Sequence, residues 1–178
     1  MIRVLSVIGI LALLVGLFVF GLSRGRPDRN IRSNYLGKAV PSFELPVYDR
    51  YRTSYGDTLA LDTLKGTPLV INFWSPTCPP CYDEAPHLER SWQAHQDEVV
   101  FLGVHTRDSG MDGGRDFISQ FDLSFPNVFD AEKTTMIDYG LFGLPETFFV
   151  KADGTLLYKH VGFLSEAILE EKIAELLQ

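Results

Sequence analysis

Cysteine is scarce in this chain of 178 residues, which contains only Cys78 and Cys81. Two cysteines cannot build the multiple-disulfide scaffold of a small secreted domain. They also supply only half of a four-ligand zinc site. The four histidines are scattered along the chain, at His87, His95, His105 and His160. We therefore expect no metal site, and a redox couple is favoured over a static disulfide, because closing so small a loop removes little chain entropy.

Basic residues are also few, with 16 Lys and Arg against 23 Asp and Glu and a net charge of −7. The imbalance lies in residues 39–178, which carry 10 basic and 22 acidic side chains. An acidic body is a poor partner for nucleic acid, because phosphate contacts need clustered Lys and Arg. Residues 23–38 carry five basic side chains and one acidic, and they follow an apolar segment. Anionic lipid headgroups are the natural neighbours of such a stretch.

The N-terminal segment is apolar, and between Val4 and Leu22 its only polar side chain is Ser6. As a helix it would span the hydrocarbon core of a bilayer, about 30 Å. It is longer than the core of a signal peptide, about 7–15 residues, although a removed signal peptide remains the alternative. We predict a transmembrane anchor at 1–22, a basic linker at 23–38 and one domain at 39–178. The arginines after the segment favour a cytoplasmic domain by the positive-inside rule.

Apolar patterns predict the elements of the domain. Near-continuous apolar runs indicate buried strands at 68–74 and 99–104, and shorter strands are expected at 42–47, 126–129, 147–151 and 155–161. Helices are expected at 79–95, 112–121, 132–139 and 165–177, with helical turns at 59–64 and a polar, turn-rich stretch at 48–57. Asp153-Gly154 indicates a hairpin, and Ser165 is a candidate N-cap. This order implies an α/β fold with a central sheet covered by helices on both faces.

The cysteines lie where a predicted strand gives way to a predicted helix. Cys78 precedes Pro79, which disfavours the helical conformation for Cys78 and suits an N-cap, with proline at the first helical position. Helix N-termini favour thiolates, the nucleophiles of disulfide exchange. We therefore assign Cys78 as the attacking thiol and Cys81 as the resolving thiol. Pro79 and Pro80 remove two N–H groups that could stabilise a thiolate, so we expect a pKa lowered less than in strong oxidants, and a reducing couple.

The motif Phe73-Trp74-x-x-x-Cys78-x-x-Cys81 on a strand-to-helix turn resembles that of a thioredoxin fold. More narrowly, the chain resembles the membrane-anchored thiol–disulfide interchange proteins of cytochrome c maturation, the CcmG/DsbE group with its ResA- and TlpA-like relatives. The other matching segments are Leu36-Gly37-Lys38-x-x-Pro41-x-Phe43-x-Leu45-Pro46, Glu84-Ala85-Pro86, Gly103-Val104, Asp138-Tyr139-Gly140-x-x-Gly143-Leu144-Pro145-Glu146-Thr147-Phe148, Asp153-Gly154 and His160-Val161-Gly162.

This resemblance implies roles for residues far from the cysteines. Pro145 matches a cis-proline that faces the disulfide, and Leu144 would pair its main chain with a substrate; by itself, Pro145 reads as a turn proline. Glu84 and Glu146 match acidic residues that could relay protons to the cysteines; the alternative for each is a solvated surface charge. The predicted catalytic residues are Cys78, Cys81, Glu84, Glu146 and Pro145, and the predicted substrate-binding residues are Trp74, Thr77, Leu144 and Pro145.

Three positions qualify the resemblance. Asn72 stands where thioredoxins carry a buried acid, whose duty the nearby glutamates could take over. Thr77 stands where the family usually has Trp, which puts the affinity for partners in question but not the thiol chemistry. Pro79-Pro80 is not the commonest pair between the cysteines.

The implied function is reduction of a disulfide in apocytochrome c, or in the haem-ligation machinery that handles it, without a cofactor. A membrane dithiol reductant of the CcdA or DsbD kind would then restore the thiols. The family is anchored in the inner membrane by a single span, with its domain on the periplasmic side. The charge count favours the opposite orientation, and we predict the periplasmic side on the basis of the resemblance. The alternatives are a general thiol oxidase or isomerase, a copper-delivery protein that uses both cysteines and a histidine such as His160, and a tethered binding module braced by its disulfide.

Overall fold

The structure is a computed structural model that describes residues 2–23, 34–107 and 110–178, except for the side chains of residues 2–4 and 22–23. It divides the chain into two compact units, residues 1–31 and 32–178. The predicted linker at 23–38 falls largely on residues 24–33, which lie outside the described residues. Its last part, from residue 36, is attached to the second unit, because Gly37 N donates to Leu156 O at 3.0 Å. The exact domain boundaries of the sequence analysis stay predictions.

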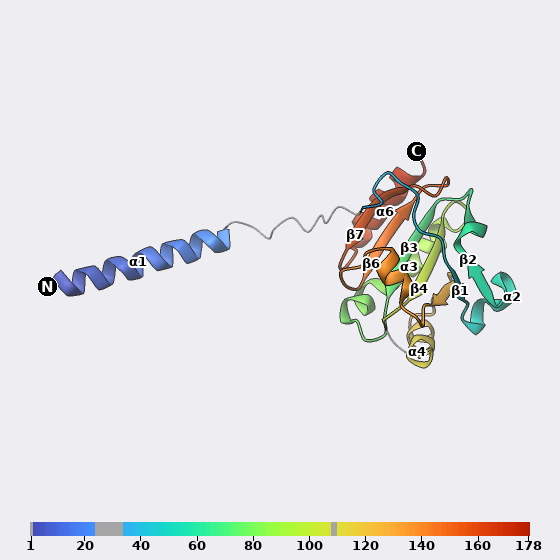
Figure 1. Cartoon of the computed structure of the whole chain (residues 1–178), viewed down its shortest axis with the longest axis horizontal. Coiled ribbons are helices and arrows are strands. Elements are labelled where there is room, and N and C mark those ends of the chain that lie inside the picture. Colours follow the sequence, from blue (N-terminus) through green and yellow to red (C-terminus); the bar gives the residue numbers. More distant parts are fainter. Residues whose placement is uncertain (1, 24–33, 108–109) are drawn as a thin grey trace. The chain divides into compact units, whose positions relative to one another are not determined.

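The described part of the first unit is the helix α1 (Ile2–Ser23), shown in blue in Figure 1. The described side chains of α1, at 5–21, are exposed. Across the part of the chain that the structure describes, no helix combines the length and the apolar character needed to cross a membrane.

The second unit is built on a five-stranded mixed sheet in the order β5-β4-β3-β6-β7. The strands are β3 (Leu69–Trp74), β4 (Val100–His105), β5 (Asn127–Phe129), β6 (Glu146–Val150) and β7 (Leu156–Val161). β3 pairs with β4 in parallel and with β6 antiparallel, so the sheet changes direction beside its central strand. All six residues of β3 are buried, as its apolar run predicts for a strand covered on both faces.

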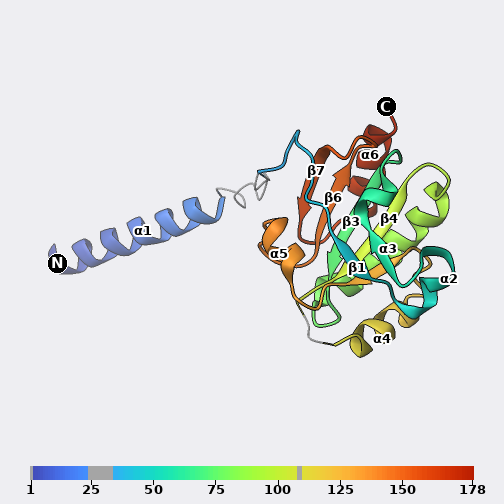
Figure 2. The same ribbon diagram turned by 45° about the vertical axis from the view of Figure 1, so that its right-hand side comes forward.

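Besides short helical segments between residues 49 and 64, this unit contains the helices α3 (Pro79–His95), α4 (Asp112–Gln120), α5 (Thr134–Asp138) and α6 (Glu166–Leu176). α3 and α6 pack against each other and lie behind the sheet in Figure 2, whereas β1 (Glu44–Pro46) lies in front of it. α3 continues through Pro86 without interruption. The α/β architecture and the predicted strands and helices from residue 68 onwards are confirmed, with shifts of a few residues at their ends.

The cap and the hairpin follow the predicted local chemistry. The Ser165 side chain accepts a hydrogen bond from Ile168 N at the start of α6. Gly154 has φ +87°, and the turn is closed by Gly154 N donating to Lys151 O at 2.8 Å. α6 ends at Leu176, so Leu177, predicted to be the last residue of this helix, lies beyond it and is 41% exposed.

The predictions between residues 48 and 64 are wrong in part. Residues 58–60 form β2 (Thr58–Ala60), which pairs antiparallel with β1, and only Leu61–Leu64 is helical, as the 3₁₀ helix η2. The stretch at 48–57, predicted to be turn-rich, contains η1 (Asp49–Tyr51) and the single-turn α2 (Arg52–Tyr55). The reason is tertiary: Tyr51 is buried, and its hydroxyl donates to Leu123 O at 2.7 Å.

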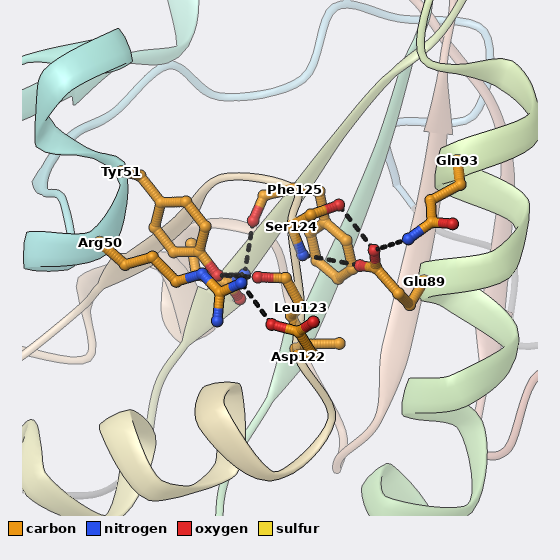
Figure 3. Close-up of polar contacts among 9 residues, drawn as sticks. Arg50, Tyr51, Glu89, Gln93, Asp122, Leu123, Ser124 and Phe125 are labelled. Atoms are coloured by element: carbon orange, nitrogen blue, oxygen red, sulfur yellow. Dashed lines mark hydrogen bonds and ion pairs between the residues drawn. The ribbon is translucent and has the colours of Figure 1, made fainter.

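Figure 3 shows how polar contacts join this N-terminal segment and α3 to the loop before β5. Arg50 forms an ion pair with Asp122 on one side of the loop. On the other side, the buried carboxylate of Glu89 in α3 accepts hydrogen bonds from Ser124 N at 2.7 Å and Ser124 Oγ at 2.6 Å. These contacts attach the middle of α3 to the body of the domain, and α3 is the helix that begins at the cysteines.

Candidate active site

The two cysteines are joined by a disulfide at the N-terminus of α3. Cys78 is the N-cap residue, with extended backbone angles of φ −104° and ψ 102°, and Pro79 and Pro80 open the helix. Cys81 N donates to Cys78 O at 3.0 Å, which places the second cysteine within the first turn. The N-cap position that was predicted for Cys78 from the proline after it is confirmed.

The two sulfur-bearing residues differ in their access to solvent. Cys78 is 6% exposed and Cys81 is 1% exposed. A protein disulfide can therefore approach Cys78 more readily than Cys81, in keeping with the order of attack expected from the sequence. Thr77, the residue before Cys78, is exposed, and its backbone N–H donates to Ser75 Oγ at 3.0 Å. Thr77 thus lies on the surface beside the disulfide, where a partner can touch it.

Trp74 lies in the core and not on a docking surface. Its side chain is 2% exposed and stacks between His105 and Phe117, with ring centroids 4.7 Å and 4.4 Å away. The indole N–H donates to Asn127 Oδ1 at 2.9 Å. The prediction that Trp74 contacts substrate is wrong, because β3 is covered on both faces and its last residue is already interior. Trp74 instead supports the strand that leads into the cysteine motif.

Glu84 is a buried acid one helical turn after Cys81, on the same side of α3. The residue is 1% exposed, which excludes a solvated surface charge. Its carboxyl group accepts hydrogen bonds from Asn72 Nδ2 at 2.7 Å and from Leu164 N at 3.0 Å. Burial raises the pKa of Glu84 from its ordinary 4.5 to about 8, although both hydrogen bonds act to lower it. An acid with this pKa can exchange protons near neutrality.

The peptide bond between Leu144 and Pro145 is cis, as the resemblance implies. Pro145 is buried and Leu144 is partly exposed. Gly162 N donates to Pro145 O at 2.8 Å, which fixes the proline to the chain that leaves β7. The structure thus provides a fixed turn with a partly exposed residue before its proline, which is the arrangement that main-chain pairing with a substrate would need.

Glu146 is also buried, but its surroundings differ from those of Glu84. It is 0% exposed, and its Oε2 lies 2.7 Å from the ammonium of Lys159, which is 5% exposed. Glu146 Oε1 accepts hydrogen bonds from Phe142 N at 2.7 Å and Gly143 N at 3.1 Å. The carboxylate is therefore engaged in an ion pair and in holding a loop, which does not favour a proton relay.

Sequence reasoning missed Lys159. The only signal was a lysine within a predicted strand, which by itself reads as a solvent-facing position. Among the residues that the structure describes, no group of three or more His, Cys, Asp or Glu side chains could hold a metal ion.

The sheet order, the cysteine pair that caps α3 and the cis-proline together define a thioredoxin-like protein of the thiol–disulfide class. Residues 36–159 match the AhpC/TSA family, and the chain belongs to this family, among its DsbE- and ResA-type thiol:disulfide interchange proteins.

Two curated relatives and one solved structure illustrate the similarity. The thiol:disulfide interchange protein DsbE of Vibrio cholerae is 31% identical over 172 residues, covering 92% of this chain and 87% of the relative. The thiol-disulfide oxidoreductase ResA of Halalkalibacterium halodurans is 31% identical over 117 residues, covering 65% of this chain and 66% of the relative. The crystal structure of a putative DsbE from Chlorobium tepidum superposes with a TM-score of 0.73 at 25% identity, covering 80% of this chain and 98% of that one.

Proposed function

We propose that this protein is a thiol:disulfide oxidoreductase that reduces disulfides in other proteins through Cys78 and Cys81. The observation that carries the proposal is the disulfide at the N-terminus of α3, with Cys78 as the N-cap. The positive end of the helix favours a thiolate at this position in the reduced protein. The remaining steps need only the two sulfurs and a group that exchanges protons with them.

The reaction proceeds in two exchanges. The Cys78 thiolate attacks one sulfur of the substrate disulfide, a mixed disulfide forms, and the other substrate sulfur leaves as a thiolate. Cys81 then loses its proton and attacks Cys78 Sγ, which releases the second substrate sulfur and forms the Cys78–Cys81 disulfide. The substrate disulfide gains two electrons and two protons, and the dithiol loses them.

Glu84 is the proposed proton carrier for Cys81. It accepts the proton that Cys81 loses during resolution and returns it when a dithiol partner reduces the disulfide again. Its burial one turn after Cys81 and its pKa of about 8 support this role, because neither protonation state is strongly favoured near neutrality.

The proposed substrate is a disulfide of apocytochrome c, or of a protein that handles it, reduced so that haem can be attached to free thiols. The similarity to DsbE over 92% of the chain supports this choice. A membrane dithiol reductant of the CcdA or DsbD kind is the proposed electron donor. The net charge of −7 gives no support to a nucleic-acid partner.

We further propose that the apolar segment 1–22, whose end side chains lie outside the described residues, is a single-span anchor in the inner membrane, with the thioredoxin-like domain on the periplasmic side. This rests on the sequence from Val4 to Leu22, whose only polar side chain is Ser6, and on the resemblance to the anchored family. A reporter fused to the C-terminus tests the orientation. Reporter activity in the cytoplasm would contradict the proposal.

Trapping with Cys81→Ala tests the function. The variant lacks the resolving thiol, so a mixed disulfide on Cys78 should accumulate with the protein's partners and dissolve on reduction. The matched control, Cys78→Ser, retains Cys81 and should trap nothing. A binding module would retain its function in Cys78→Ser, which would contradict the proposal. The reduction potential separates a reductant from an oxidase, since strong oxidants lie near about −120 mV and reductants well below.

A further inference from the structure

Two charged side chains meet inside the domain, under the loop that leads to the cis-proline. Lys159 Nζ and Glu146 Oε2 are 2.7 Å apart, and their side chains are 3% and 0% exposed. Taking two charges out of water is costly, and a buried ion pair repays that cost only with good geometry and further hydrogen bonds. The further bonds of this pair indicate what it does.

Both charged groups hold the backbone of residues 140–143. Glu146 Oε1 accepts from Phe142 N at 2.7 Å and from Gly143 N at 3.1 Å. Lys159 Nζ donates to Gly140 O at 3.0 Å. The pair thus binds three backbone groups within these four residues. This segment runs directly into Leu144 and the cis peptide bond, so the pair fixes the approach to the turn that the proposed function places against a substrate.

Lys159 also contacts an exposed aromatic ring. Its Nζ lies 5.1 Å from the ring centroid of Phe142 and 5.1 Å from that of Phe148. Phe148 is buried, whereas Phe142 is 69% exposed. An ammonium at this distance attracts the face of an aromatic ring. Lys159 therefore holds Phe142 at the surface, two residues before Leu144.

A cavity of about 210 Å³ lies next to this ring. Phe142, Ile137 and Tyr139 line it together with the polar side chains of Asn34, Asp138 and Lys159, and Ile137 is 81% exposed. Exposed apolar side chains around a hollow are suited to an apolar side chain of a bound protein. Disulfide exchange at Cys78 does not itself need an apolar cavity, whereas recognition of a polypeptide substrate does.

We propose that the Glu146–Lys159 ion pair is a positioning device that presents Phe142 and the Leu144–Pro145 turn to an extended, disulfide-containing polypeptide with an apolar side chain near its cysteines. This inference rests on the proposed function. It assigns Glu146 and Lys159 to substrate recognition, acting through the loop, and not to proton transfer. The pair thereby sets a preference for polypeptide disulfides over small ones.

Lys159→Met tests the proposal, because it removes the charge and keeps a long apolar stem. The pre-reduced protein is mixed with increasing concentrations of a synthetic peptide that holds one internal disulfide flanked by leucines, and separately with 5,5′-dithiobis(2-nitrobenzoate). We expect the half-saturating concentration of the peptide to rise about tenfold or more. The limiting rate and the reaction with the small disulfide should stay within twofold. Lys159→Arg, which restores a cation, should recover most of the loss.

Two further variants separate recognition from folding. Lys151→Met makes the same change on an exposed lysine at the other end of the β6–β7 hairpin and should behave as the wild type. Phe142→Ala alters a side chain that is mostly exposed and leaves both charges in place, so it should fold even where Lys159→Met does not. It should raise the half-saturating peptide concentration in the same way, and an unchanged value in Phe142→Ala would overturn the proposal.

The remaining outcomes are also decisive. Equal losses with both disulfides, or a shifted pH profile with the small disulfide, would show that the pair serves the chemistry and would overturn the inference alone. A wild-type protein that reduces neither disulfide would overturn the proposed function and this inference with it. Loss confined to the peptide in Lys159→Met and Phe142→Ala supports both.

Discussion

Asn72 Nδ2 donates a hydrogen bond to Glu84 Oε1 at 2.7 Å, across the interface between the central strand β3 and the helix α3. The same amide nitrogen lies 3.0 Å from Thr147 Oγ1, on the neighbouring strand β6. Both Asn72 and Glu84 are almost completely buried. The acid that thioredoxins carry on this strand is thus replaced here by an amide, and the acidic group comes from the helix that holds the cysteines.

Glu84→Gln should change how stability depends on pH. In the wild type the pKa of Glu84 is raised by burial from 4.5 to about 8, so between these values the folded protein binds a proton that the unfolded chain has released. The contribution of this group is therefore fully present below about pH 4.5 and is lost as the pH rises towards about 8, at up to about 1.4 kcal/mol per pH unit. Denaturant unfolding of the oxidised protein at several pH values measures it.

The variant should lack this part of the slope between pH 5 and 8. Below about pH 4.5 its stability should also be lower than that of the wild type, because the Gln side chain cannot accept from both Asn72 Nδ2 and Leu164 N, and an unsatisfied buried donor costs about 1–3 kcal/mol. Glu132→Gln, on an exposed side chain, should keep the wild-type slope. Parallel curves for the wild type and Glu84→Gln would contradict the assignment.

Glu84→Gln should also slow the resolving step. Without a group that takes the proton from Cys81, attack on the mixed disulfide should slow by about 10²-fold, the lower range for general acid–base catalysis. The first attack by Cys78 should be little affected. Rapid-quench separation of the mixed disulfide from the final products measures the two steps independently. Equal slowing of both steps would argue for a general disturbance of the helix.

Asn72→Leu should raise the pKa of Glu84 further. The Asn72 hydrogen bond favours the ionised carboxylate and so lowers the pKa of Glu84. When this bond is removed, the rise caused by burial is opposed only by the hydrogen bond from Leu164 N. The free energies of unfolding of Asn72→Leu and of the matched double variant Asn72→Leu/Glu84→Gln are measured against pH. Their difference reports the titration of Glu84, and its inflection should move above pH 8. Thr147→Val removes the other partner of Asn72 and leaves its bond to Glu84 intact. If the inflection for Glu84 moved in Thr147→Val but not in Asn72→Leu, this explanation would be contradicted.

Gly103→Ala should destabilise the domain by about 1–3 kcal/mol or more, as overpacking does in a filled core. A Cβ at Gly103 would lie 1.9 Å from Asn127 Oδ1 and 2.9 Å from Trp74 Nε1, so the hydrogen bond between those side chains could not persist. Gly110→Ala is the control, because nothing lies within 4 Å of a Cβ built there. Denaturant midpoints of the two variants provide the measurement, and equal midpoints would contradict the packing argument.

The sequence by itself determined the features that depend on neighbours in the chain. The apolar run into β3, the break at Pro76 and the two prolines after Cys78 set a strand, a turn and a capped helix from local preferences. The Asp153-Gly154 turn and the Ser165 cap are local in the same sense. The cysteine pair, its place at the helix terminus and most of the strands and helices in their order along the chain could therefore be predicted.

Only the tertiary structure decided which polar groups are buried and what they bind. Glu84 receives a hydrogen bond from Leu164, 80 residues later, and Glu146 meets Lys159 across the β6–β7 hairpin. Trp74, expected beside a substrate, is enclosed by His105 and Phe117 from two other elements. Tyr51 is buried and binds Leu123 O, and residues 58–60 form a strand because they pair with β1. Burial and pairing depend on which segments the fold brings together, and local patterns contain little of that information.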